Sequence, residues 1–462
     1  MRPGTVAAFG GTAILLLGMI GAASAAPRQR TVQVDLSRSR EVQNESSIGI
    51  DPGSPKLLVA ASQDTSVCGI RTYASDDGGR RWTSAPVLVA DPSATRRAIG
   101  AGKFCAFNQW VGAGRDGRQY AVFGQNGTFK TGYGIELASR EYPQAWSTPR
   151  PVDPTLAGTG GFDDKPMMTI DNSPAGPHAG RIYVAWTRWS IAGVDGHVLL
   201  AHSDDHGQTW SAPTTVPSAK GANWGIHLAV ARDGALYAAA WNGSGPGDLW
   251  ITRSGDGGAT FEHPRVYASR VGSPSSGNSY VLAEPTQPIH SDASLGIDTS
   301  TGPRAGSVYT AYSRATRGGR RIVVNAFGQD LKSDLKHMIA VRPTRRAYDE
   351  FNPAIAVDAS NGTVWACFYV SGTGKQRALA TYSCVESRNG GRNWSRVIGG
   401  ASVPSNETVH GAFNRAHFID NDYASYEGLA VSAGMAHPIW TDTRNLKRAR
   451  EEIYTTSLRA PR

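Results

Sequence analysis

The chain repeats one pattern of hydrophobic and polar positions seven times. Each copy starts with polar residues, alternates small and apolar residues up to an aspartate or its equivalent, turns at a glycine, and returns as a short apolar run with tyrosine or tryptophan. Two short alternating runs joined by a glycine-containing turn predict a β-hairpin. Self-similarity at a wide, fairly regular spacing indicates a repeat architecture. The copies are 44–61, 108–123, 164–186, 224–241, 292–312, 352–368 and 426–440.

Most copies continue into a third and a fourth strand. Apolar runs at 198–202 and 249–253 are examples of the third strand. Four antiparallel strands repeated around an axis form the blades of a β-propeller. The last copy is one strand short, and 31–36 could supply that strand and close the ring. We therefore predict an all-β propeller of four-stranded antiparallel blades, with seven blades favoured and six as the alternative; only 330–337 suggests a helix.

A second motif, S-x-D-x-G-x-T-W/F, follows several of the third strands. Short Asp and Ser side chains hydrogen-bond the backbone within a turn, and glycine supplies a positive φ. The aromatic residue then packs back under the hairpin. These residues are expected to hold turns, so no chemistry is assigned to Asp77, Asp205 or Asp256. The copies are 203–210 and 254–261, with looser ones at 75–82 and 387–394 and a degenerate fifth at 139–146.

The N-terminus has the features of an export signal. Arg2 gives it a positive start, 6–20 is apolar, and 23–25 reads Ala-Ser-Ala, a small-x-small cleavage site. The apolar run is too short for a good transmembrane helix, and nothing later approaches the required length. We predict a signal peptide over 1–25, a single propeller domain over 26–462, and a secreted protein without a membrane span.

The four cysteines suggest two disulfides, because an even, low count in an exported protein is typical of structural bridges. Spacing alone allows three pairings. The repeat map favours Cys68–Cys105, which would join two loops on one face, and Cys367–Cys384, which lie on neighbouring strands of the sixth unit. The sequence has no C-x-x-C pair, so neither a zinc nor a redox site is indicated.

The formal net charge is +9, which suits either solubility or an acidic partner such as an anionic glycan. The basic pairs are scattered along the chain and no basic stripe is interleaved with aromatic residues, which argues against a nucleic-acid binder. The chain has no G-x-S-x-G and no phosphate-binding loop motif. We expect no metal and no cofactor, and a monomer.

Propellers usually bind ligands at the mouth of the central channel, where the innermost strands begin. The residue three before the first apolar position of each copy is polar or has a polar tip in six of seven cases. Strand entries are often polar simply because they are solvated, so this column has a structural reading as well. The column is Glu45, Asn108, Lys165, Gly225, Asp292, Asn352 and Tyr426, and Asp164, His227 and Glu427 are among its neighbours.

Arginines form a second column where the second strand of a hairpin returns to the same face. Arg188, Arg314 and Arg444 occupy it. A guanidinium group binds a carboxylate with two parallel hydrogen bonds, so the three could hold an acidic ligand. They could equally form ion pairs with the acidic residues at the neighbouring strand entries.

The motifs together resemble the sialidase-like, BNR or Asp-box, exported β-propellers. Besides the turns above, 421–430 and 437–444 look like the closing blade of such proteins. True sialidases have six blades, an arginine triad for the sugar carboxylate, a tyrosine nucleophile activated by glutamate, and an aspartate as acid and base. The chain lacks the F/Y-R-I-P motif that carries the first arginine of that triad.

The resemblance implies a hypothesis for each role. Arg188, Arg314 and Arg444 would form the triad, Tyr426 with Glu427 the nucleophile pair, and Asp164 or Asp292 the acid; Glu45, Lys165, His227 and Asn352 would contact the substrate. The resulting interpretation is a secreted, sialidase-like carbohydrate-active protein, a glycoside hydrolase that acts on a carbohydrate, including an acidic glycan. The alternative is a non-catalytic propeller that binds a glycan or a protein. The two differ in whether acidic groups converge in one pocket.

Overall fold

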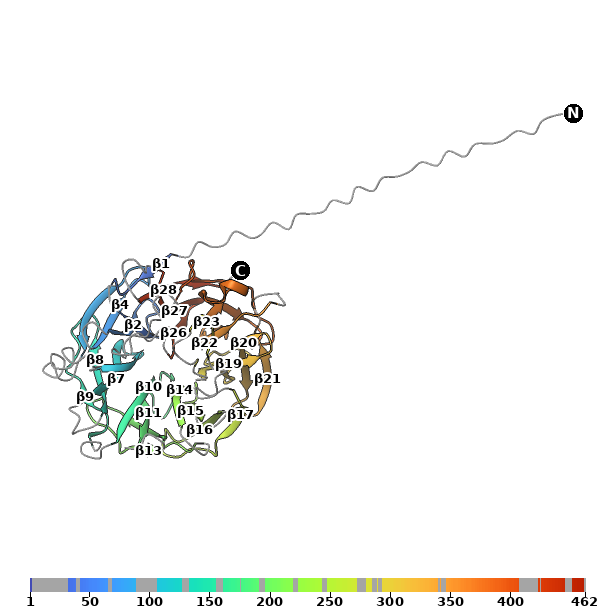
Figure 1. The fold of residues 1–462 in the computed structure, drawn as a ribbon. Coiled ribbons are helices and arrows are strands. Elements are labelled where there is room, and N and C mark those ends of the chain that lie inside the picture. Colours follow the sequence, from blue (N-terminus) through green and yellow to red (C-terminus); the bar gives the residue numbers. More distant parts are fainter. Residues whose placement is uncertain are drawn as a thin grey trace. The chain divides into compact units, whose positions relative to one another are not determined.

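The structure is a computed structural model, and all of its strands belong to the unit Thr31–Arg462. The sheets form four-stranded antiparallel blades arranged as a ring (Figure 1). Within the described residues, no helix is long and apolar enough to cross a bilayer. The residues that the structure describes are 1, 32–38, 42–64, 69–88, 106–126, 133–154, 161–174, 176–190, 196–218, 223–242, 247–271, 280–284, 289, 293–339, 341, 346–406, 423, 425–444 and 451–460.

Seven blades are formed by the described strands, in chain order from blade 1 to blade 7. Blades 1 to 4 are β2 (Gln43–Ile50), β3 (Leu58–Asp64), β4 (Gly69–Ser75) and β5 (Thr83–Leu88); β6 (Ala106–Ala113), β7 (Arg118–Asn126), β8 (Tyr133–Glu141) and β9 (Arg150–Pro151); β10 (Phe162–Ile170), β11 (Ile182–Trp189), β12 (Gly196–Ser203) and β13 (Thr214–Thr215); and β14 (Asn223–Val230), β15 (Leu236–Asn242), β16 (Asp248–Ser254) and β17 (Arg265–Ser269). Blades 5 and 6 are β18 (Ser294–Ile297), β19 (Val308–Thr316), β20 (Gly319–Phe327) and β21 (Ser333–Met338); and β22 (Glu350–Val357), β23 (Val364–Ser371), β24 (Ala380–Ser387) and β25 (Gly399–Gly400). Blade 7 is β26 (Gly428–Ser432), β27 (Met435–Asp442), β28 (Glu452–Thr456) and β1 (Gln33–Asp35), with β29 (Leu458–Arg459) also paired to β27.

The two ends of this unit close the ring together. β1 pairs antiparallel with β28, with Val34 opposite Thr455, so the N-terminal strand is the outer strand of the last blade. This confirms the predicted closure and the favoured count of seven blades over six. The innermost strands of successive blades contact one another all the way round, from β2 through β26 and back to β2.

Small residues in the repeat are explained by the crowding of the innermost strands. A Cβ on Gly49 of blade 1 would lie 2.9 Å from the Cα of Gly112 of blade 2. A Cβ on Gly428 of blade 7 would lie 2.9 Å from the backbone nitrogen of Ile48. Larger residues at these positions would push the blades apart, whereas tryptophans and tyrosines further from the axis fill the wider space between blades.

The S-x-D-x-G turns share one hydrogen-bond pattern, as predicted. The Ser203 hydroxyl accepts the Gly207 N–H at 2.8 Å and donates to Asp205, whose carboxylate accepts the N–H groups of Gln208 and Thr209. The same serine-to-glycine bond occurs at 75–79, 254–258 and 387–391. The aspartates are occupied in holding the turns.

Two other sequence predictions have definite outcomes. Cys367 and Cys384 face each other on β23 and β24 and form a disulfide, as predicted. The suggested helix at 330–337 is wrong, because Ser333–Met338 is the outer strand of blade 5. Lys336 and Met338 are exposed while Leu335 and His337 are partly buried, which is the period of a strand. The Cys68–Cys105 pairing and the signal peptide lie outside the described residues.

Candidate functional site

A β-bulge recurs where the innermost strands begin, at the positions of the polar column. The pairing register shifts at this point in blades 1, 2, 3, 4 and 6. A bulge re-aims side chains and is frequent next to active sites. In each case the column residue has a positive φ, an uncommon conformation for lysine and glutamate. The angles are 53° for Glu45, 52° for Asn108, 52° for Lys165, 61° for Gly225 and 46° for Asn352.

Lys165 is the centre of the polar cluster that these bulges bring together. Its Nζ lies 3.3 Å from Oε1 of Glu45 and donates to the Ser425 hydroxyl at 2.6 Å. The ammonium group also lies 5.5 Å from the ring centres of both Trp224 and Tyr426, within cation–π range. The Glu45 and Lys165 side chains are only 6% and 8% exposed, so their ion pair is shielded from solvent.

Asp164 lies beside this ion pair. Its Oδ1 accepts the Asn108 amide at 2.7 Å and the Lys165 backbone N–H at 2.9 Å. Burial raises the pKa of this carboxyl group, and the negative charge of Glu45 adds to the rise, while Lys165 opposes it. A carboxyl group with a raised pKa holds its proton to higher pH and can donate it.

Glu45 differs from Asp164 in its environment. Its Oε1 is in the ion pair with Lys165, whereas its Oε2 is buried and has no hydrogen-bond partner among the described residues. A buried carboxylate oxygen without a partner is uncommon and calls for an explanation, such as a bound group that supplies the donor. The cluster therefore contains two carboxyl groups in different electrostatic settings, both adjacent to one lysine.

Aromatic rings form the other wall of the cluster. Trp110 lies 5.6 Å from Tyr426 and 5.8 Å from His227, centre to centre. The Tyr426 hydroxyl donates to the Gln109 carbonyl at 2.9 Å. Burial and the charge of Lys165 lower the pKa of His227 to about 4, so this imidazole is neutral at ordinary pH. Trp110, Trp224 and Ser425 were not selected from the sequence.

Glu427 is oriented away from this wall, into the contact between blades. Its carboxyl group accepts the Tyr369 hydroxyl at 2.5 Å and the Thr441 N–H at 2.9 Å, and it is also bonded to the Ser46 hydroxyl. Burial raises the pKa of Glu427 to about 8 and that of Tyr369 well above its usual value. The tyrosine that contacts Glu427 is therefore Tyr369, a fully buried phenol that stays protonated.

The three column arginines lie in three different blades. Arg188 of blade 3 forms an ion pair with Asp163 at 2.7 Å and another with Asp153 at 2.8 Å. Arg444, just after β27 of blade 7, forms one with Asp442 at 2.6 Å. Two of the three guanidinium groups are thus paired with carboxylates, Arg188 with Asp163 of its own blade and with Asp153 after β9 of blade 2, which is the structural alternative raised from the sequence.

The remaining column residues are placed as follows. Arg314 is in β19 of blade 5, near Lys336, where burial and the charge of Arg314 lower the lysine pKa. Asn352 is buried at the bulge of blade 6. Asp292 lies outside the described residues. Among the described residues, no group of three or more His, Cys, Asp and Glu side chains is arranged to hold a metal ion.

The seven four-stranded blades define the class of the molecule as a seven-bladed β-propeller. Solved structures with a similar fold include the "Hadza microbial sialidase Hz136" (13% identity, covering 88% of this chain and 74% of that one, TM-score 0.48) and the NanB sialidase of Streptococcus pneumoniae (8%, 87% and 83%, TM-score 0.46). The α-L-arabinofuranosidase Arb93A of Fusarium graminearum is a third (11%, 77% and 93%, TM-score 0.47). No protein-family model and no curated protein sequence matches the chain.

Proposed function

We propose that the protein is an exported glycoside hydrolase that cleaves its substrate at the channel mouth, with Asp164 as the proton donor. The observation that carries this proposal is the pair of carboxyl groups around Lys165. Glycosidases commonly use one carboxyl group that is protonated and a second that is ionised. Environments that differ in this way separate the roles of acid and of base or nucleophile.

Each described group in the cluster has a place in such a reaction. The Asp164 proton would pass to the glycosidic oxygen as the bond to the anomeric carbon breaks. Glu45, in its ion pair with Lys165, would stabilise the positive charge that develops on that carbon or activate the incoming water. Trp224 and Tyr426 would offer aromatic faces to the sugar ring. The Glu427–Tyr369 contact would keep blades 6, 7 and 1 in register behind the site.

Export and an acidic substrate are finer parts of the proposal. The Cys367–Cys384 disulfide supports an oxidising compartment, since such bridges are rare in the cytosol. The net charge of +9 would attract an acidic glycan over long range. The paired state of Arg188 and Arg444 gives no support to a sialidase-type arginine triad, so the substrate class proposed is an acidic glycan rather than sialic acid in particular.

A glycan-binding propeller without catalysis is the second candidate. Asp164 already accepts two hydrogen bonds within the protein, which uses acceptor positions that a catalytic acid would keep for solvent or substrate. In that case the cluster would serve only to shape a binding surface.

The test is the release of reducing sugar and of free sialic acid from a panel of neutral and acidic glycans. Asp164→Asn should lower the rate by about 10²–10⁴-fold, the usual contribution of a general acid. Asp330→Asn is the matched control, because Asp330 is an exposed residue of the blade 5 turn paired with Lys332. Release that persists in Asp164→Asn would refute the assignment. Binding on a glycan array with no release from any glycan would establish the second candidate.

A further inference from the structure

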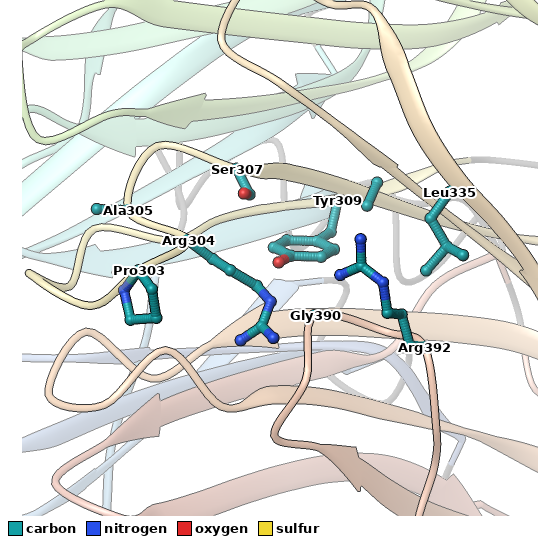
Figure 2. Close-up of a pocket in the computed structure, with 9 residues that line it drawn as sticks. Pro303, Arg304, Ala305, Ser307, Tyr309, Leu335, Gly390 and Arg392 are labelled. Carbon is teal, nitrogen blue, oxygen red and sulfur yellow. The ribbon is translucent and has the colours of Figure 1, made fainter.

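A pocket lies between blade 5 and the S-x-N-x-G turn of blade 6, apart from the polar cluster around Lys165. Its volume is about 360 Å³. Figure 2 shows Arg304 and Arg392 extending into it from opposite walls, with Tyr309 between them. Ser307 and Leu335 also line it. We propose that this pocket binds a tetrahedral oxyanion, a sulfate or phosphate group, either free or carried by a sugar.

The two arginines are available for a ligand. Neither is in an ion pair within the described part of the chain; Arg304 makes one long hydrogen bond to the Arg388 carbonyl (3.4 Å) and Arg392 one to the Asn389 carbonyl (3.5 Å). Burial raises the pKa of Tyr309, and the positive charges of both arginines lower it, so both guanidinium groups act on the Tyr309 hydroxyl. Arginine in pairs is the preferred residue for sulfate and phosphate, because its planar fork matches two oxygens at once.

The carboxyl groups in the same turns are already engaged. Asp298 accepts the Ser300 N–H at 2.9 Å, as part of the turn between β18 and β19. Glu386 forms an ion pair with Arg388 at 3.2 Å. Among the described residues neither Arg304 nor Arg392 is in an ion pair, and the nearest acidic influence on the pocket is the charge of Asp298, which raises the pKa of Tyr309.

The corresponding junction between blades 3 and 4 is occupied by an arginine side chain. There Arg181 fills the space, with its guanidinium group 3.1 Å from the Gly257 carbonyl and in a bidentate ion pair with Asp204. In blade 5 the residue before the second strand is Ser307, at the place of Arg181. Val308 pairs with Phe327 in blade 5, and Ile182 pairs with Ser203 in blade 3. The residue after each pairing partner is therefore equivalent, which puts Gly328 at the position of Asp204. Two small residues thus replace an ion pair and leave a cavity.

The other differences between the two junctions all make the blade 5–6 junction more positive. Arg304 stands at the place of His178, two residues before the turn glycine in each case. Arg392 takes the place of Ala259 in the turn motif, and Asn389 the place of Asp256. The blade 3–4 junction has one arginine and two aspartates at these positions, whereas the blade 5–6 junction has two arginines and no acid.

The shape of the pocket also depends on Gly390. A Cβ at this position would lie 2.5 Å from Cδ of Arg304 and 3.2 Å from the Tyr309 hydroxyl, so any side chain would displace the arginine. The volume exceeds that of a bare ion and lies within the range of small-ligand sites. A sulfated or phosphorylated monosaccharide could therefore be held by its anionic group.

The experiment is isothermal titration calorimetry of the purified protein with sodium sulfate and with galactose 6-sulfate, in a low-salt buffer. Saturable binding is expected for the sulfate group, and Arg304→Gln or Arg392→Gln should weaken it about ten-fold or more, the value of a charged hydrogen bond. Arg396→Gln is the control, because Arg396 is an exposed arginine of the same blade that does not line the pocket. Tighter binding of galactose 6-sulfate identifies a sugar as the source of the anion, and equal binding identifies the free ion.

Ser307→Arg separates the pocket from general electrostatic attraction. This variant restores the arginine of the blade 3–4 junction, so it fills the cavity while adding a positive charge. Binding should be lost even though the net charge rises. Asp164→Asn should bind as the wild type does, since its site is separate. The absence of saturable binding, unchanged binding in the two glutamine variants, or wild-type binding by Ser307→Arg would overturn the proposal; Arg392 is exposed, so its variant tests the proposal even if the others misfold.

Discussion

Replacing Glu427 by glutamine should remove a large part of the pH-dependent stability between pH 5 and 7. The buried carboxyl group has a pKa of about 8 in the folded protein, against 4.5 as its usual value. The folded state therefore holds the proton more tightly than the unfolded chain does. The resulting stabilisation is complete below about pH 4.5 and is lost as the pH rises towards 8.

The size of the effect follows from the two pKa values. Between pH 5 and 7 this group is mostly ionised in the unfolded chain and mostly protonated in the folded protein. This difference of nearly one bound proton lowers the free energy of unfolding by about 2–3 kcal/mol over the range. For a domain of more than 400 residues, whose entropy of unfolding is about 0.9 kcal/mol/K, this corresponds to about 3 °C in Tm. Glutamine has nearly the shape of the protonated acid: its oxygen can accept the Tyr369 and Thr441 bonds, and its amide can donate to Ser46.

The assay is differential scanning calorimetry of the wild type and of Glu427→Gln at pH 5 and pH 7. Burial also raises the pKa values of Glu136 and Glu350, each to about 7, but both groups titrate in both proteins. The difference in Tm between the two proteins isolates Glu427. The Tm of the variant minus that of the wild type should be about 3 °C larger at pH 7 than at pH 5. A difference that is the same at both pH values would show that the reasoning is wrong.

Two further predictions concern stability. Replacing both Cys367 and Cys384 by alanine should cost about 3 kcal/mol, because the bridge closes a loop over a sequence separation of 17 residues; urea denaturation under non-reducing conditions measures the loss. Gly319→Ala should destabilise more than Gly434→Ala, because its Cβ would lie 2.0 Å from the Tyr348 carbonyl oxygen, whereas Gly434 has open space. Both glycines have a positive φ, so Gly434→Ala should cost only about 1 kcal/mol of backbone strain, and equal losses in the two denaturation curves would contradict this account.

The sequence predicted the fold because each copy of the repeat corresponds to one blade. Small residues recur where innermost strands nearly touch, as at Gly49 and Gly112, and the missing outer strand of blade 7 had to come from the other end of the chain. The helix suggested at 330–337 was wrong because an exposed edge strand has a weak alternation that a short window does not resolve.

The site was predictable only in part. The polar column identified Glu45 and Lys165, because corresponding positions of the repeat lie at the same height in each blade. The sequence of the column does not indicate that these residues form a β-bulge with a positive φ. Contacts between blades could not be predicted from the sequence, because they join residues that are far apart in it. Glu427 lies 58 residues from Tyr369 and 381 from Ser46, so its neighbour Tyr426 looked like the better partner.

The central claim is that Asp164 donates a proton to the leaving group, and the most direct test varies that leaving group. Two substrates with the same sugar are compared, one carrying a second sugar and the other 4-nitrophenol, which departs without protonation. Asp164→Asn should slow hydrolysis of the first by about 10²–10⁴-fold and of the second by far less. Equal losses on both substrates, or none on either, would contradict the proposed role.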